Sequence, residues 1–179
     1  MYHCTSEGVQ DAAKSMTRKE YNQCVELYAD GLYRFLVKNL RDSEKARDLV
    51  QETFAKVWVK SADIQVEKCK SYLFTTAYHA MVDSIRRDER MVRLDEKHRS
   101  KQQAFNSYSD LNEVLSEALQ GLPETQRTVV LLRDYEGYDY REIGQITGLS
   151  ESQVKVYIFR ARTALKNYIQ KLELVLEDQ

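Results

Sequence analysis

Large apolar side chains recur along this chain at the three- and four-residue spacing of amphipathic α-helices. The pattern begins at Thr17, and the first predicted helix contains the apolar residues Leu27, Tyr28, Leu32, Phe35, Leu36 and Leu40. Residues 1–16 show no sustained period, so we expect them to form a loose N-terminal extension.

Two further helices are expected before residue 90. Asp42 or Ser43 can cap the second helix, because short polar side chains accept hydrogen bonds from the first free backbone N–H groups. Residues 61–70 break the helical period and are predicted to form a loop. Ser71 then caps a third, long helix that ends near Arg90.

Residues 91–110 have few apolar side chains, many charges and no consistent period, which is typical of a flexible linker. This linker divides the chain into two small helical domains, residues 17–90 and residues 111–179. With only 6 glycines and 1 proline in 179 residues there are few sites for hairpin turns, so the predicted fold class is all-α.

The most informative pattern lies between residues 140 and 165, where two helices are predicted to meet at a tight turn. Gly148 supplies a permissive turn residue, and Ser150 supplies an N-cap hydroxyl for the second helix. The buried stripe predicted for that second helix is Val154, Ile158, Ala161 and Leu165. Its opposite arc carries basic and small side chains together with the aromatic Phe159. The pattern alone leaves open whether this is an ordinary helical hairpin or a helix-turn-helix that reads duplex DNA.

Charge is distributed unevenly along the chain. The net charge of -1 and pI of about 6.3 exclude a general polyanion-binding composition. Basic residues are concentrated instead in residues 85–101 and 155–171. Nucleic-acid binding is therefore expected only at these two local patches.

Three scattered cysteines, Cys4, Cys24 and Cys69, fit free thiols in a reducing compartment better than a disulfide framework. The first residues lack a basic leader with an apolar core, and no apolar run approaches the length of a membrane span. We therefore expect a cytoplasmic protein without direct membrane insertion.

Three stretches and the linker between them together resemble, in order and spacing, an extracytoplasmic-function (ECF) type RNA polymerase sigma factor, which has regions two and four only. The stretches are DLVQETFAKVW (48–58), SYLFTTAYHAMVDSIRR (71–87) and LPETQRTVVLLRDYEGYDYREIGQITGLSESQVKVYIFRARTAL (122–165). The resemblance implies a non-enzymatic factor that needs no cofactor or metal, binds core RNA polymerase and directs promoter-specific transcription initiation.

By resemblance, the second helix would dock on the clamp helices of the largest polymerase subunit. The residues expected at this contact are Asp48, Gln51, Glu52 and Lys56. The first domain would recognise and melt the -10 element of promoter DNA. The candidate -10 contacts are Lys68, Lys70, Tyr72, His79, Arg86 and Arg87.

The resemblance also implies that the helix-turn-helix reads the -35 element through the outward arc of its second helix. The candidate -35 contacts are Ser152, Lys155, Val156, Phe159, Arg160, Arg162 and Lys166. A further expected partner is an anti-sigma factor, membrane-linked in this reading, that would cover the polymerase- and DNA-binding faces.

The same residues fit other classes of protein less well. Asp48 and Glu52 are spaced like paired catalytic or metal-binding carboxylates, but no neighbouring histidine or glycine-rich loop accompanies them. The histidines and cysteines match no compact zinc spacing. A DNA-binding regulator that shares only the helix-turn-helix is the remaining alternative. Such a regulator would carry an α/β ligand or phosphoacceptor domain where this chain has helices.

Overall fold

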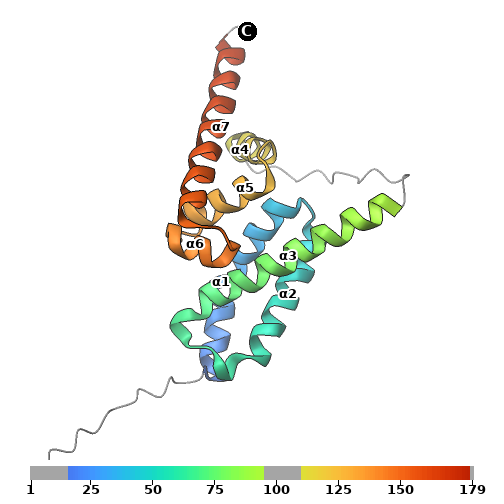
Figure 1. The fold of residues 1–179 in the computed structure, drawn as a ribbon, viewed down its shortest axis with the longest axis vertical. Helices are drawn as coiled ribbons and strands as arrows, with labels where there is room; N and C mark the ends of the chain where they lie inside the picture. Colours follow the sequence, from blue (N-terminus) through green and yellow to red (C-terminus); the bar gives the residue numbers. More distant parts are fainter. Residues whose placement is uncertain (1–15, 95–109, 178–179) are drawn as a thin grey trace, which may run out of the picture.

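The computed structural model describes residues 16–94 and 110–177, which contain helices and turns and no strand (Figure 1). The N-terminal helices are α1 (Arg18–Leu40), α2 (Ser43–Val59) and α3 (Cys69–Leu94). The C-terminal helices are α4 (Asp110–Gln120), α5 (Glu124–Val130), α6 (Tyr140–Thr147) and α7 (Glu151–Glu177). Short 3-10 turns occupy Ser61–Asp63 and Val66–Lys68, and a π-helical turn over Leu131–Tyr135 continues α5. The all-α prediction is confirmed.

The first helix begins where the sequence pattern predicted. Thr17 caps α1 in a capping box with Glu20, in which the Thr17 backbone N–H donates to the Glu20 carboxylate at 2.8 Å. Met16, however, is buried, and its backbone N–H donates to the Ser61 carbonyl at 3.1 Å. The prediction of a loose extension was therefore wrong at Met16, whose side chain joins the apolar core, while residues 1–15 lie outside the described residues.

The bounds of α3 differ from the prediction at both ends. The helix begins at Cys69, because the 3-10 turn Val66–Lys68 leads directly into it, and Ser71 lies inside the first turn instead of capping it. At the other end α3 continues to Leu94, since neither glycine nor proline interrupts residues 90–94. The predicted linker therefore begins with helix, and its residues 95–109 lie outside the described residues.

The apolar core is continuous between the two sets of helices. Phe35 of α1 and Phe74 of α3 meet edge to face with ring centroids 5.6 Å apart, and Tyr138 lies 5.5 Å from Phe74 in the same manner. Tyr138 precedes α6, so the C-terminal helices pack directly on α1 and α3 (Figure 1). The division into two domains, residues 17–90 and 111–179, stays a prediction.

Two thiols illustrate how this core shields reactive groups. Cys24 and Cys69 are free and buried where α1 passes the start of α3. Burial, with the Cys24 thiol beside it, raises the pKa of the Cys69 thiol from 9.0 to about 12. Because the thiolate is the reactive form of cysteine, Cys69 should be inert in the folded protein. Burial also keeps reagents away from Cys24.

We expect a Cys4→Ser variant to resist a thiol-specific chromogenic reagent at pH 8 and to react at both remaining thiols once guanidinium unfolds it. Rapid labelling of either thiol in the native protein would contradict this expectation. The free energy of unfolding should also fall as the pH rises from about 9 towards 12, because the unfolded thiol ionises in that range while the pKa of folded Cys69 is higher. Denaturant titrations across this range measure that decline.

Candidate nucleic-acid and partner interfaces

The helix-turn-helix forms as the sequence predicted. Asp139 and Glu142 make a capping box at the start of α6, and Gly148 ends that helix with a positive φ of 76°. Ser150 caps α7 through Gln153, with the Ser150 N–H donating to the Gln153 side-chain oxygen at 2.9 Å. The two helices pack through the buried residues Ile143, Ile146, Val154, Ile158 and Ala161. Polar caps and a glycine thus hold α6 and α7 at a tight turn.

The outward arc of α7 presents an apolar pair flanked by cations. Phe159 is 72% exposed and Val156 is 45% exposed, which is unusual for large apolar side chains on a helix with a well-packed opposite face. Lys155 lies 2.7 Å from the Glu151 carboxylate, and its ammonium stands 5.5 Å from the centre of the Tyr140 ring. All seven candidate -35 residues are exposed on α7: Ser152, Lys155, Val156, Phe159, Arg160, Arg162 and Lys166.

Arg162 has an intramolecular partner that sequence reasoning did not anticipate. Its guanidinium forms a two-pronged ion pair with the Asp134 carboxylate, with one N–H···O distance of 3.1 Å. This hydrogen bond raises the pKa of Arg162. The pair links the middle of α7 to the π-helical turn. Because it lies at the surface, it contributes little to stability and can exchange with other anions.

The candidate polymerase-binding residues share one exposed face of α2. Asp48, Gln51, Glu52 and Lys56 are all exposed, while Leu49, Thr53, Phe54 and Val57 are buried on the opposite face. Glu52 and Lys56 form an ion pair at 2.6 Å. They also line a groove together with Ala80, Asp83, Arg87 and Arg90 of α3.

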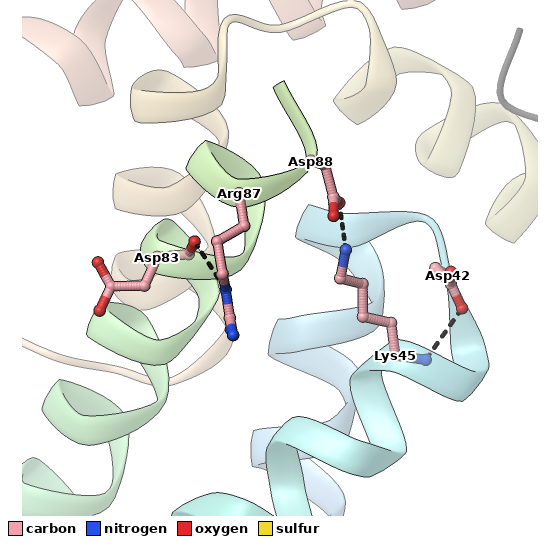
Figure 2. Close-up of polar contacts among 5 residues, drawn as sticks. All are labelled: Asp42, Lys45, Asp83, Arg87 and Asp88. Atoms are coloured by element: carbon pink, nitrogen blue, oxygen red, sulfur yellow. Dashed lines mark hydrogen bonds and ion pairs between the residues drawn. The ribbon is translucent and has the colours of Figure 1, made fainter. Parts of the chain in front are cut away.

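One ion pair joins the start of α2 to the far half of α3, next to hydrogen bonds within each helix (Figure 2). The Asp42 side chain caps α2 by accepting from the Lys45 backbone N–H at 3.0 Å, and the Lys45 ammonium pairs with the Asp88 carboxylate. On α3 the Arg87 Nε donates to the Asp83 carbonyl at 3.3 Å. The Arg87 guanidinium is therefore held beside the groove, next to the acidic face of α2.

The candidate -10 residues fall into two sets. Lys68, His79, Arg86 and Arg87 are exposed, whereas Tyr72 is half-buried and packs against the core. Lys70 is also half-buried, and it faces the C-terminal helices. Its ammonium donates to the Glu136 carbonyl at 2.6 Å and stands 4.7 Å from the centre of the Tyr138 ring.

Sequence reasoning missed the polar residues where the two sets of helices meet. Asn39, Arg127 and Thr128 are buried there and joined by hydrogen bonds. Arg127 precedes the apolar run TVVLL, and its position on the buried side of that helix was the only available signal. Its partner Asn39 lies on α1, so no local pattern could have paired them.

Two family matches cover most of the chain. Residues 24–91 match Sigma-70 region 2, and residues 112–165 match Sigma-70, region 4. The ECF RNA polymerase sigma factor SigM of Bacillus subtilis (strain 168) is 28% identical over 150 residues, which cover 81% of this chain and 92% of SigM. The sigma factor SigV of the same organism is 24% identical over 90% of this chain and 98% of its own length.

Solved structures agree with these matches. The sigma factor RpoE from Bartonella quintana, described in complex with the anti-sigma factor NepR, superposes with a TM-score of 0.77 at 26% identity. That superposition covers 85% of this chain and 98% of RpoE. CnrH, described in complex with the cytosolic domain of CnrY, has a TM-score of 0.64 at 22% identity over 87% of this chain and 90% of CnrH, and shows the shared fold.

The helix-turn-helix, the α2–α3 face and the two family matches define a sigma factor of the sigma-70 class. Within that class the chain belongs to the ECF RNA polymerase sigma factors. Such factors are not enzymes, and they direct core RNA polymerase to specific promoters. None of the helices in residues 16–94 and 110–177 has the apolar run that crossing a bilayer would require.

Proposed function

We propose that this sigma factor divides promoter recognition between its two sets of helices. The N-terminal helices bind core RNA polymerase and recognise and melt the -10 element, while α7 reads the -35 element. The observation that carries this proposal is the exposed pair Val156 and Phe159 on the outward arc of the second helix of a helix-turn-helix. A DNA major groove admits one α-helix and offers thymine methyl groups to apolar side chains.

The cations around that apolar pair suit the same surface. Lys155 and Arg160 flank Phe159 and can reach base edges, while Lys166, further along α7, can hold a phosphate. Arg162 can do the same after releasing Asp134, since an exposed ion pair exchanges readily with a phosphate. Specificity for the -35 element would then come from Lys155, Val156, Phe159 and Arg160.

The N-terminal helices offer two further faces. The exposed acidic and polar residues of α2 complement a basic helical partner, which supports docking on the clamp helices of the largest polymerase subunit. Lys68, His79, Arg86 and Arg87 are exposed along the turn before α3 and along α3 itself, where they can hold an opened DNA strand. Tyr72 offers an aromatic ring near the start of α3, close in sequence to Lys68.

We further propose a cytoplasmic location and control by an anti-sigma factor. RpoE, whose two-part fold this chain shares at 26% identity, is described in complex with the anti-sigma factor NepR. An inhibitor of this kind, membrane-linked in our proposal, would cover the α2 face and the DNA-binding faces. Native purification that recovers the protein with polymerase, and never with an inhibitor, would count against this part.

Reconstituted transcription tests the central proposal. Purified protein added to core RNA polymerase should start transcripts at a defined subset of promoters in a genomic template library. Core polymerase alone should not start there. Specific duplex binding without any initiation would instead favour a regulator that acts on DNA by itself.

Arg160→Ala should weaken binding to a -35 duplex by about 1–3 kcal/mol, the range for one good base contact. A gel-shift titration on a promoter mapped by the reconstitution measures this change. Lys171→Ala is a matched control, because Lys171 is exposed on the same side of α7, three turns beyond Arg160 and past Lys166, the last of the proposed contacts. Equal losses in both variants would indicate general electrostatics, and unchanged binding by Arg160→Ala would remove Arg160 from the site.

A further inference from the structure

A buried polar cluster joins the two sets of helices near the end of α1. Arg127 is only 8% exposed, and its guanidinium donates to the carbonyls of Asn39 and Leu122, each at 3.0 Å. The Thr128 hydroxyl donates to the Asn39 side-chain oxygen at 2.9 Å, and the Asn39 amide donates to the Phe35 carbonyl at 2.8 Å. Asn39 therefore bonds both to its own helix and to α5.

A second contact covers the start of α3. Glu136 lies in the turn after α5, and its side chain is 12% exposed. Its carbonyl accepts a hydrogen bond from the Lys70 ammonium at 2.6 Å, and its carboxylate lies 3.9 Å from the same ammonium. Gly31 of α1 leaves room for this carboxylate, since a Cβ there would lie 3.2 Å from it. Tyr138 fills the adjacent space over Phe74 and Lys70.

We propose that residues 134–138, named here the masking turn, occupy a DNA-contact site on the N-terminal helices, so that the docked protein and the -10-bound protein exclude one another. This inference rests on the proposed function, because it takes Lys70 as a -10 phosphate contact. The masking turn offers Lys70 a carboxylate and a carbonyl oxygen, which are the kind of acceptor that a phosphate offers. The Lys70 ammonium cannot bind the Glu136 oxygens and a DNA phosphate at the same time.

The interface is built in a way that permits separation. Within residues 16–94 and 110–177 no carboxylate forms an ion pair with Arg127, whose Nε is buried without a hydrogen bond. Desolvation lowers the pKa of its guanidinium. The Tyr138 hydroxyl is buried beside Ser71 without a well-formed hydrogen bond. Both groups would regain water when the helices separate, which offsets part of the apolar contact that is lost. Interfaces between domains of one chain are commonly of this separable kind.

A docked arrangement is also present in a relative. One superposition on RpoE covers 85% of this chain with a TM-score of 0.77, more than either set of helices could supply alone. The two sets are therefore placed similarly in RpoE, which is described with its anti-sigma factor bound. In this chain, the C-terminal helices should pack on the N-terminal helices without an anti-sigma factor.

Spin labels on the full-length protein test this expectation. Cysteines placed at the exposed positions Glu26 of α1 and Lys171 of α7, in a Cys4→Ser background, report the separation of the two sets of helices by double electron–electron resonance. The labelled protein that carries no further substitution should give one narrow distance distribution. Glu136→Lys, which repels Lys70, and Thr128→Val, which leaves the Asn39 oxygen unpaired, should each broaden the distribution towards longer distances.

DNA binding provides the second measurement, with a fluorescein-labelled single-stranded DNA of mixed sequence as the probe. Both opening variants should bind it at least about fivefold more tightly than wild type, and adding Lys70→Ala should remove that gain. Glu117→Lys is the matched control for charge, since Glu117 is exposed and contacts Tyr168 within the C-terminal helices. Thr128→Val changes no charge at all, so its gain cannot come from electrostatics.

Three outcomes would overturn the proposal. The first is a broad distribution of long distances in the labelled protein without further substitution. The second is unchanged distances in both opening variants. The third is a longer distance in the opening variants with no gain in affinity for the single-stranded DNA. Reconstituted transcription with core polymerase distinguishes these results from failure of the proposed function. If the wild-type protein is open in solution and still initiates transcription, the proposed function holds and the proposed masking of Lys70 is wrong. If neither wild type nor any variant initiates transcription, the proposed function is wrong. The distances and the affinities for single-stranded DNA still test whether residues 134–138 cover Lys70.

Discussion

Gly144→Ala is expected to destabilise the helix-turn-helix by about 1–3 kcal/mol, the usual cost of overpacking, and to abolish its binding to a -35 duplex. A Cβ at Gly144 would lie 2.7 Å from the Leu149 carbonyl oxygen, in the turn that joins α6 to α7. Backbone atoms cannot rotate away as a flexible side chain would. The turn must therefore shift, and α7 would lose its placement relative to α6.

Urea denaturation and a gel shift on the same promoter duplex measure the two effects. Gly121→Ala is the matched control, because a Cβ there meets only the Ala118 carbonyl at 3.5 Å, an ordinary van der Waals contact. That control should keep wild-type DNA binding. If Gly144→Ala were as stable and as tightly bound as wild type, close packing at this turn would not hold the reading helix in place.

Reversing two charges on α2 should have the largest effect on the polymerase. Asp48→Lys combined with Glu52→Lys is expected to reduce affinity for core RNA polymerase by at least about tenfold, because it puts like charges against a basic partner surface. Stability should change little, since both residues are exposed and the Glu52–Lys56 pair lies at the surface. Binding of the -35 duplex should be unaffected.

The control applies the same charge change to α1. Glu26 and Asp30 are exposed and also lie four residues apart on one helix, so Glu26→Lys with Asp30→Lys matches the α2 variant in charge and spacing. Affinity for core polymerase, measured by fluorescence anisotropy, should fall only in the α2 variant. Equal affinity in wild type and the α2 variant would remove this face from the polymerase contact.

Local features made the helices predictable. Thr17, Asp42 and Ser150 accept or exchange hydrogen bonds at helix starts, and Gly148 ends α6 in a left-handed conformation that few other residues adopt easily. The error at the start of α3 has one local cause and one tertiary cause. Ser71 is an attractive cap by residue type, but the 3-10 turn before Cys69 had already begun the helical path, and tertiary burial of Cys69 favoured the earlier start.

Exposure was predictable for the α2 and α7 faces, because a helical period assigns opposite sides to the core and to solvent. The amino-acid sequence by itself determined the all-α class, the helix-turn-helix and its outward arc, and the family. These depend on contacts within a few residues along one helix, or on motif order along the chain. They need no knowledge of which helices meet.

Only the tertiary structure decided the partners of the charged residues. Lys70 meets Glu136, Arg127 meets Asn39 and Arg162 meets Asp134, across 66, 88 and 28 residues of sequence. A lysine or arginine in the sequence can face water, DNA or a distant carbonyl. Helical periodicity therefore cannot predict which partner the cation has. The packing of α5 and the masking turn on α1 and α3 makes that choice, because it brings oxygen acceptors to cations that would otherwise face solvent.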